Sequence, residues 1–172
     1  MKRLILSLAL LALGFAWSAC KNPAGPSSTS KTTFTAVLLP ANEVPAIVGA
    51  ESAGSGTATI TLNLTKDSNG YVTSAKADVS VTVTGFPNGM SLTDAHIHGG
   101  AAGTNGGVFV SLGLSAGEFT FPTGTGSFVK SGLNVTVDQA NALIANPSNF
   151  YFNIHTAANP GGVARGQLAI VQ

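Results

Sequence analysis

The chain has 172 residues, a length that limits it to one domain or to one domain with a tail. Only 9% of its residues are charged and its net charge is +1, so it lacks the basic surface of a nucleic-acid-binding protein. An apolar content of 44% argues against a disordered chain. The single cysteine excludes an internal disulfide and a multi-cysteine zinc site.

Residues 1–19 predict a secretory signal peptide. Lys2 and Arg3 precede an almost entirely apolar run over residues 4–17. This run is too short for a transmembrane helix and is typical of the core of a signal peptide. The only cysteine, Cys20, follows directly, and in bacterial lipoproteins the signal peptide is removed just before a cysteine that then carries the lipid.

We therefore expect Cys20 to be a lipid-attachment site, which makes the membrane a partner of the protein through its N-terminal lipid. The location predicted is the bacterial cell envelope, and Lys21 favours the outer membrane if the organism is Gram-negative. Ordinary secretion is the alternative. Residues 20–33 contain almost nothing to bury and predict a flexible linker that lifts the domain from the membrane.

From residue 34 onward the apolar residues recur with a period of two. The clearest case is residues 57–65, where apolar residues alternate strictly with polar ones, and Asn69-Gly70 then predicts a hairpin turn. Similar runs, separated by turns rich in Gly and Pro, predict further strands at residues 34–39, 71–86, 92–98, 108–114, 119–121, 126–129, 150–156 and 163–171.

One helix interrupts the strands. Thr136 and Gln139 form a capping box, and Pro147 ends the apolar stripe that follows. Seven to nine short strands and one short helix predict an all-β fold, an antiparallel sandwich or barrel, over residues 34–172.

The placement of histidine is the most informative chemical feature. His96 and His98 lie two apart on a predicted strand, so their side chains share a face. Because Ala95 and Ile97 would point into the core, the histidines and Asp94 would point to the opposite face.

His155, the third histidine, shares a face with Tyr151 and Asn153 on the predicted strand over residues 150–156. If the two strands are neighbours, the three imidazoles and Asp94 converge. Three histidines can bind copper or zinc, with Asp94 as a fourth ligand or as an acceptor for an imidazole N–H. The alternative is a scaffold in which these side chains only donate hydrogen bonds that hold the Gly-rich loops.

Arg165 is the only arginine beyond the signal peptide. Its guanidinium would donate to loop carbonyls or to Asp94, or else bind an anion. The sequence contains no phosphate-binding loop, nucleophile elbow or other complete catalytic set, which favours a role without catalysis.

Short motifs in a fixed order, over about residues 33–172, resemble the CHRD domain, named after chordin. They are Phe34-Thr35-Ala36, Asn42-Glu43-Val44-Pro45, Ala95-His96-Ile97-His98-Gly99, Gly106-Gly107-Val108, Tyr151-Phe152-Asn153-Ile154-His155-Thr156, Asn159-Pro160-Gly161-Gly162 and Arg165-Gly166-Gln167-Leu168. The chain departs from the family at Ala46, where a second proline is common, and at Val163, where the family often has an acidic residue.

The resemblance implies an immunoglobulin-like β fold and a location outside the cytoplasm. It does not specify a reaction. The family motif residues that it places on this chain form either a site or a scaffold: Glu43, His96, His98, Asn153, His155, Asn159, Arg165 and Gln167. We expect an exported, lipid-anchored, non-enzymatic module that binds an unknown protein or surface ligand. The alternative is a copper- or zinc-binding protein, including one with redox chemistry.

A fainter similarity is to Cu/Zn superoxide dismutase, a Greek-key sandwich. That family has a His-x-His strand with copper ligands and an arginine near its C-terminus, and His96, His98 and Arg165 stand in the same order here. The further histidines and the disulfide cysteines of that family are missing, so dismutase activity is not expected.

Overall fold

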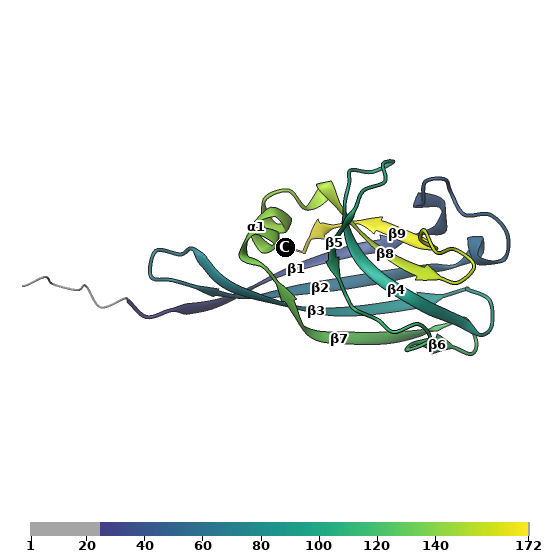
Figure 1. Cartoon of the computed structure of the whole chain (residues 1–172), viewed down its shortest axis with the longest axis horizontal. Coiled ribbons are helices and arrows are strands. Elements are labelled where there is room, and N and C mark those ends of the chain that lie inside the picture. The colour runs from purple at the N-terminus through teal and green to yellow at the C-terminus, as the bar shows by residue number, and fades with distance from the viewer. Residues whose placement is uncertain (1–24, 172) are drawn as a thin grey trace, which may run out of the picture.

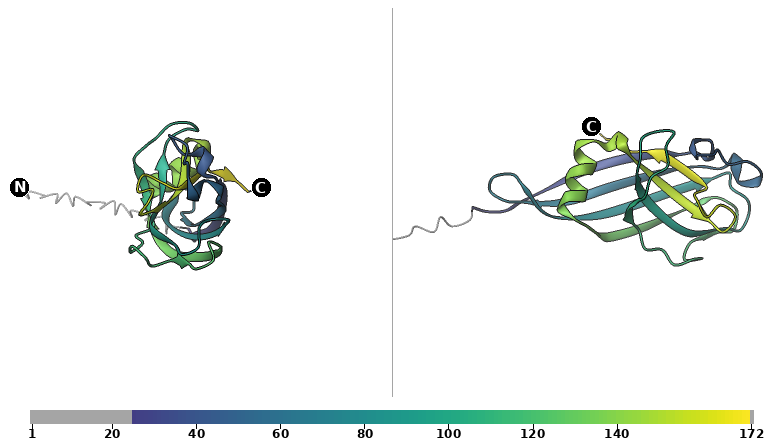
Figure 2. Two further views of the ribbon diagram at one scale, coloured as in Figure 1. Left: turned by 90° about the vertical axis from the view of Figure 1, so that its right-hand side faces the viewer. Right: turned by 45° about the horizontal axis from the view of Figure 1, so that its top comes forward.

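The computed structural model describes residues 25–171, which form two antiparallel five-stranded sheets packed as a sandwich (Figure 1 and Figure 2). The predicted signal peptide over residues 1–19 and the predicted lipid-attachment site Cys20 lie outside the described residues. Within residues 25–171, no helix has the length and apolar character needed to cross a membrane.

The first sheet, called sheet A, has the order β10-β1-β2-β3-β7. Its strands are β10 (Ala169–Ile170), β1 (Ser28–Leu38), β2 (Ser55–Lys66), β3 (Val72–Thr84) and β7 (Gly126–Val135). The second, sheet B, has the order β5-β4-β8-β9, and β6 pairs with β4. Its strands are β5 (Val108–Ser111), β4 (Met90–Gly99), β8 (Phe150–Thr156), β9 (Ala164–Gln167) and β6 (Thr120–Phe121).

This architecture confirms the predicted all-β antiparallel sandwich. The strand pairs do not close into a barrel, although an isolated bridge from Leu39 to Arg165 joins the two sheets along one edge. The described residues form ten strands where seven to nine are expected, because the last predicted strand is split in two. The predicted strand over residues 163–171 is divided, since the chain leaves sheet B after Gln167 and joins sheet A at Ala169.

The predicted linker over residues 20–33 is wrong for its last six residues. Strand β1 begins at Ser28 and pairs without interruption from Ser28 with Lys66 to Leu38 with Gly56. The Ser and Thr side chains there bury little, but the backbone still forms its hydrogen bonds with β2. Figure 1 shows this part of β1 extending with the β2–β3 hairpin beyond the rest of the sandwich.

The buried residues confirm that apolar side chains recur at every second position along the strands. Ile60 is fully buried and lies between Phe34 of β1 and Val79 of β3 in the sheet register. Burying each side chain of this size contributes roughly 1.5–3 kcal/mol. Inward-facing residues of sheet B, among them Ile97 and Phe152, close the core from the other side.

Helix α1 (Val137–Ala145) has the predicted capping box. The Gln139 N–H donates to Oγ1 of Thr136 at 3.1 Å, and the Thr136 N–H donates to Oε1 of Gln139 at 2.9 Å. The helix buries Ala140 and Leu143, and the short 3₁₀ helix η3 (Pro147–Asn149) leads into β8.

The outer face of sheet B is covered by loops, so all seven residues of β8 are buried. Three segments contribute to this cover: residues 40–48 with the 3₁₀ helix η1 (Pro40–Asn42), residues 100–107, and residues 157–163. A second 3₁₀ helix, η2 (Ala50–Ala53), lies against the last of these segments through Glu51. Polar residues predicted to face outward therefore lie in a buried layer between sheet and loops.

Candidate functional site

The candidate site lies on β4 and β8, which are direct neighbours. The antiparallel register pairs Asp94 with His155, His96 with Asn153, and His98 with Tyr151. Because alternate residues share a face, this pairing brings the three histidines together. It meets the condition stated in the sequence analysis, that the two strands be neighbours.

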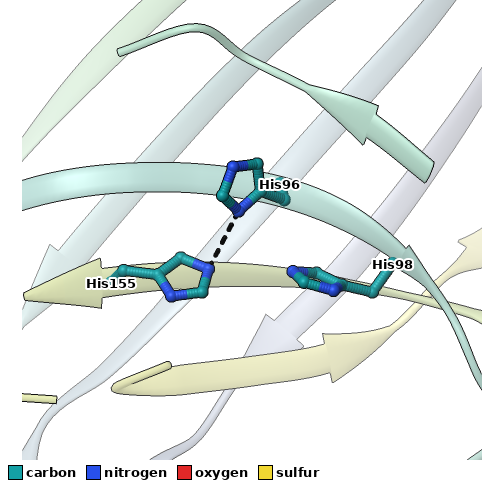
Figure 3. A group of neighbouring side chains, drawn as sticks. All are labelled: His96, His98 and His155. Atoms are coloured by element: carbon teal, nitrogen blue, oxygen red, sulfur yellow. Dashed lines mark hydrogen bonds between the residues drawn. The ribbon is translucent and has the colours of Figure 1, made fainter. Parts of the chain in front are cut away.

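The three imidazoles point toward one another (Figure 3). One ring nitrogen from each of His96, His98 and His155 lies within 4.8 Å of the others. Three atoms no farther apart than this all lie within about 2.8 Å (4.8/√3) of a common point. Bonds from zinc to histidine nitrogen are ~2.0–2.1 Å long, so movements of less than about 1 Å would suffice to bind an ion.

Each imidazole has its other nitrogen directed at a fixed oxygen. Nδ1 of His98 lies 3.0 Å from the Gly106 carbonyl oxygen, and Nδ1 of His155 lies 3.0 Å from the Pro160 carbonyl oxygen. A carbonyl only accepts, so both Nδ1 atoms carry the proton and both Nε2 atoms have a free lone pair in the neutral ring. Hydrogen bonds of this kind select the tautomer of metal-binding histidines.

Asp94 takes the same role for His96. Nε2 of His96 lies 3.1 Å from Oδ2 of Asp94, while Oδ1 of Asp94 accepts from the Ala95 N–H at 2.8 Å. This carboxylate therefore lies behind the His96 ring, as a hydrogen-bond acceptor rather than beside the other two histidines. Of the two roles considered for Asp94, the geometry fits the acceptor.

Burial disfavours the charged form of two of the three rings. His98 and His155 are 8% and 6% exposed, and burial is the main cause that lowers the pKa of each ring below its ordinary value. Neutral imidazole is the form that binds a metal. Nε2 of His98 is buried and has no hydrogen-bond partner within the described part of the chain.

Tyr151 supports the cluster from the side. Its ring stacks on His98, and the guanidinium carbon of Arg165 lies 4.5 Å from the centre of the same ring. The Tyr151 hydroxyl accepts from the Gly106 N–H at 3.3 Å, next to the carbonyl that holds His98.

Arg165 is 2% exposed and holds two covering loops. Its Nε donates to the Asn42 carbonyl at 2.6 Å, and its Nη1 donates to the Thr104 carbonyl at 3.0 Å and to Oδ1 of Asn105 at 2.9 Å. These contacts agree with the loop-carbonyl interpretation of Arg165. Asp94 is not among the partners of the guanidinium.

Glu43 and Asn153 lie deep in the same layer. A Cβ built on Gly162 would come within 2.8 Å of Oε1 of Glu43 and 2.7 Å of Oδ1 of Asn153, so only glycine fits over them. Both oxygens are buried without a hydrogen-bond partner in the described residues. Burial raises the pKa of Glu43 from its ordinary 4.5 to about 7, although the charge of Arg165 acts in the opposite direction.

The remaining motif residues, Gln167 and Asn159, hold neighbouring segments together through hydrogen bonds. Nε2 of Gln167 donates to the carbonyls of Gly100, Ser148 and Phe150 at 3.0, 2.7 and 3.2 Å. Nδ2 of Asn159 donates to Oε2 of Glu51. Glu51 has no part in the sequence interpretation, because an acidic residue more than 100 positions from its partners leaves no local signal.

The residues of this buried layer all lie within one segment that matches a known protein family. The family model of the CHRD domain matches residues 34–168. No curated protein and no solved structure shows significant similarity to the chain. The fainter similarity to superoxide dismutase therefore stays a prediction. Because the family model covers most of the chain, including all three histidines, this protein belongs to the CHRD domain family.

Proposed function

We propose that this CHRD-domain protein binds one copper or zinc ion through Nδ1 of His96, Nε2 of His98 and Nε2 of His155. The observation that carries the proposal is the approach of Nδ1 of His96 to Nε2 of His155, at 3.0 Å. Each ring directs its other nitrogen at an oxygen, Asp94 for His96 and Pro160 for His155. In the neutral rings two lone pairs then face each other, an arrangement that a cation between them stabilises.

A metal ion would accept both lone pairs at that position. Burial lowers the pKa of His155, so a proton added to this ring is disfavoured. Imidazole nitrogens are ligands for both copper and zinc. Three protein ligands leave a fourth position for water or another ligand, the pattern of zinc sites that are not purely structural.

Metal content tests the proposal directly. The full chain is purified in mild detergent, and bound copper and zinc are measured by elemental analysis, with Asn69→Ala in the β2–β3 turn as a control. We expect about one ion per chain in the wild type and the control, and a large loss in His98→Ala. Titration with Co²⁺ adds the intense visible bands of four-coordinate cobalt in the wild type. Equal metal content in wild type and His98→Ala would refute the site.

We further propose that the protein is held in the cell envelope by a lipid on Cys20, at the outer membrane in a Gram-negative organism. The support is the sequence of residues 1–20, in which a short apolar run precedes the only cysteine. Labelled palmitate should enter the wild type, and globomycin should leave an uncleaved precursor. Label retained by Cys20→Ala, or an unlabelled wild type that is released as a secreted protein, would contradict the anchor.

An interaction module is the second candidate. Valines around η1 are exposed, with Val48 at 87% and Val37 at 60%, and they border grooves beside Glu43 and Arg165. Such apolar surface favours contact with another protein. A photocrosslinking residue placed at position 48 in living cells should give a defined adduct, whereas one at Val129 on β7, 59% exposed, should not. Identical adducts at both positions would argue against a specific surface.

A further inference from the structure

We infer that Glu51 is a positioning residue of the three-histidine site, because it holds the loop whose Pro160 carbonyl selects the metal-binding tautomer of His155. The inference rests on the proposed metal-binding function. Glu51 lies in η2, and it contacts no histidine through its hydrogen bonds.

The carboxylate of Glu51 joins two points of the loop after β8. Oε2 accepts from Oγ1 of Thr156 at 2.9 Å and also from Nδ2 of Asn159. Hydrogen bonds to a carboxylate are about twice as strong as those between neutral groups. Thr156 is 3% exposed, so the first bond is largely shielded from water.

The loop itself is closed by its own hydrogen bonds. The Asn159 N–H donates to Oγ1 of Thr156 at 3.1 Å, and the Gly162 N–H donates to the Asn159 carbonyl at 3.1 Å. The Val163 N–H donates to the Ile154 carbonyl at 2.8 Å. Pro160 lies inside this closed turn, so the direction of its carbonyl follows the positions of Thr156 and Asn159, which Glu51 holds.

The Pro160 carbonyl controls which nitrogen of His155 is free. While it accepts from Nδ1, Nε2 keeps a lone pair toward His96. If the loop relaxes and Nδ1 loses its acceptor, the proton can move to Nε2 and block the position that a metal would take. His98 provides an internal reference, since its acceptor is Gly106 in a different loop.

Nuclear magnetic resonance of the imidazole nitrogens tests this in the metal-free full chain, purified in detergent. Long-range proton–nitrogen correlations distinguish the two neutral tautomers of each histidine. We expect Nδ1–H for His155 and His98 in the wild type. In Glu51→Ala, His155 should populate Nε2–H while His98 stays unchanged. An unchanged His155, or equal changes in both rings, would overturn the inference.

Two further variants separate positioning from stability. Glu51→Gln keeps an oxygen that accepts from Thr156 and Asn159, so it should retain most of the wild-type tautomer. Glu118→Ala removes a carboxylate that bonds Lys130 and the Ser115 N–H, and it should leave both histidine signals unchanged. A tautomer change in Glu118→Ala as large as in Glu51→Ala would assign the effect to general loosening and would also overturn the inference.

Metal affinity gives the second readout. Loss of an outer partner of a histidine ligand costs 10–100-fold in affinity, and Glu51 acts one contact farther away, so we expect a loss of about tenfold in Glu51→Ala. Undiminished affinity beside an altered tautomer would refute a positioning role for metal. If the wild type binds no metal, the proposed function fails, whereas the tautomer measurement still decides whether Glu51 controls His155.

Discussion

The ring of His98 stacks on the ring of Tyr151, with centroids 5.0 Å apart and an angle of 4° between the planes. Tyr151 also lies under the Arg165 guanidinium, so a single buried residue links the three-histidine cluster to the side chain that holds two covering loops. This contact couples the geometry of the cluster to the packing of the loops. For variants of the histidine cluster or of Arg165, both the metal affinity and the free energy of unfolding should therefore be measured.

Asp94→Ala should weaken metal binding by 10–100-fold, since His96 would lose the carboxylate that fixes its tautomer. The carboxylate is 34% exposed, so its removal should cost little stability beyond the bond to the Ala95 N–H. Co²⁺ titration measures the affinity, and Asp138→Ala in the first turn of α1 serves as the control. Wild-type affinity in Asp94→Ala would show that His96 does not need this acceptor.

Gly106→Ala should disturb the loop that holds His98. A Cβ built on Gly106 would lie 1.4 Å from the Gly99 carbonyl oxygen, so this backbone must move, and the Gly106 carbonyl moves with it. We expect a loss of about 2 kcal/mol or more in the free energy of unfolding, together with weaker metal binding.

The neighbouring glycine is a matched control for this variant. A Cβ on Gly107 would meet nothing within 4 Å, so Gly107→Ala should change the free energy of unfolding by no more than about 0.5 kcal/mol. Urea unfolding of both variants makes the comparison. Similar free energies for the two would mean that the loop adapts without cost.

Glu43→Gln should change how stability depends on pH. The pKa of Glu43 rises from 4.5 to about 7 on folding, so the folded state binds the proton more tightly than the unfolded state. Its stabilising contribution is complete below pH 4.5 and is lost as the pH rises to about 7, by roughly 3 kcal/mol. Gln imitates the protonated carboxyl, so above pH 7 the variant should be the more stable protein.

Urea unfolding across pH 4–8 tests this. Both proteins also become less stable toward acid, because burial lowers the pKa values of His98 and His155. This effect is the same in the two proteins, so it cancels when their free energies of unfolding are subtracted. The difference between variant and wild type should grow from pH 4.5 to 7. Parallel curves would mean that the carboxyl of Glu43 ionises in the folded protein as it does in water.

Arg165→Met should destabilise the protein by about 3 kcal/mol, since the buried guanidinium would no longer donate to Asn42, Thr104 and Asn105 and the two loops would lose this link. Arg165→Lys should recover only part of this loss, because one ammonium cannot reproduce the planar fork. Chemical unfolding gives both values.

Lys130→Met is the control for this prediction. It removes an ion pair with Glu118 near the surface and should cost less than about 1 kcal/mol. Equal losses at Arg165 and Lys130 would contradict a loop-holding role for the guanidinium.

Local patterns in the sequence were sufficient for most of the strands and for the direction of the histidines. The alternation over residues 57–65 predicts β2, the Thr136 and Gln139 pair predicts the start of α1, and His-x-His predicts two imidazoles on one face. These features depend on residues a few positions apart, and the geometry of a strand or a helix turn translates them directly.

Only the tertiary structure decided which strands pair and which loops cover sheet B. That β4 lies beside β8 depends on residues more than 50 positions apart, and that residues 28–33 continue β1 depends on backbone bonds to β2, which composition does not encode. The same holds for Pro160 and Glu51, whose effect on His155 is produced by loop closure. The sequence determined which side chains could form a site, and long-range contacts determined their tautomers and burial, because those properties depend on neighbours that the fold alone brings together.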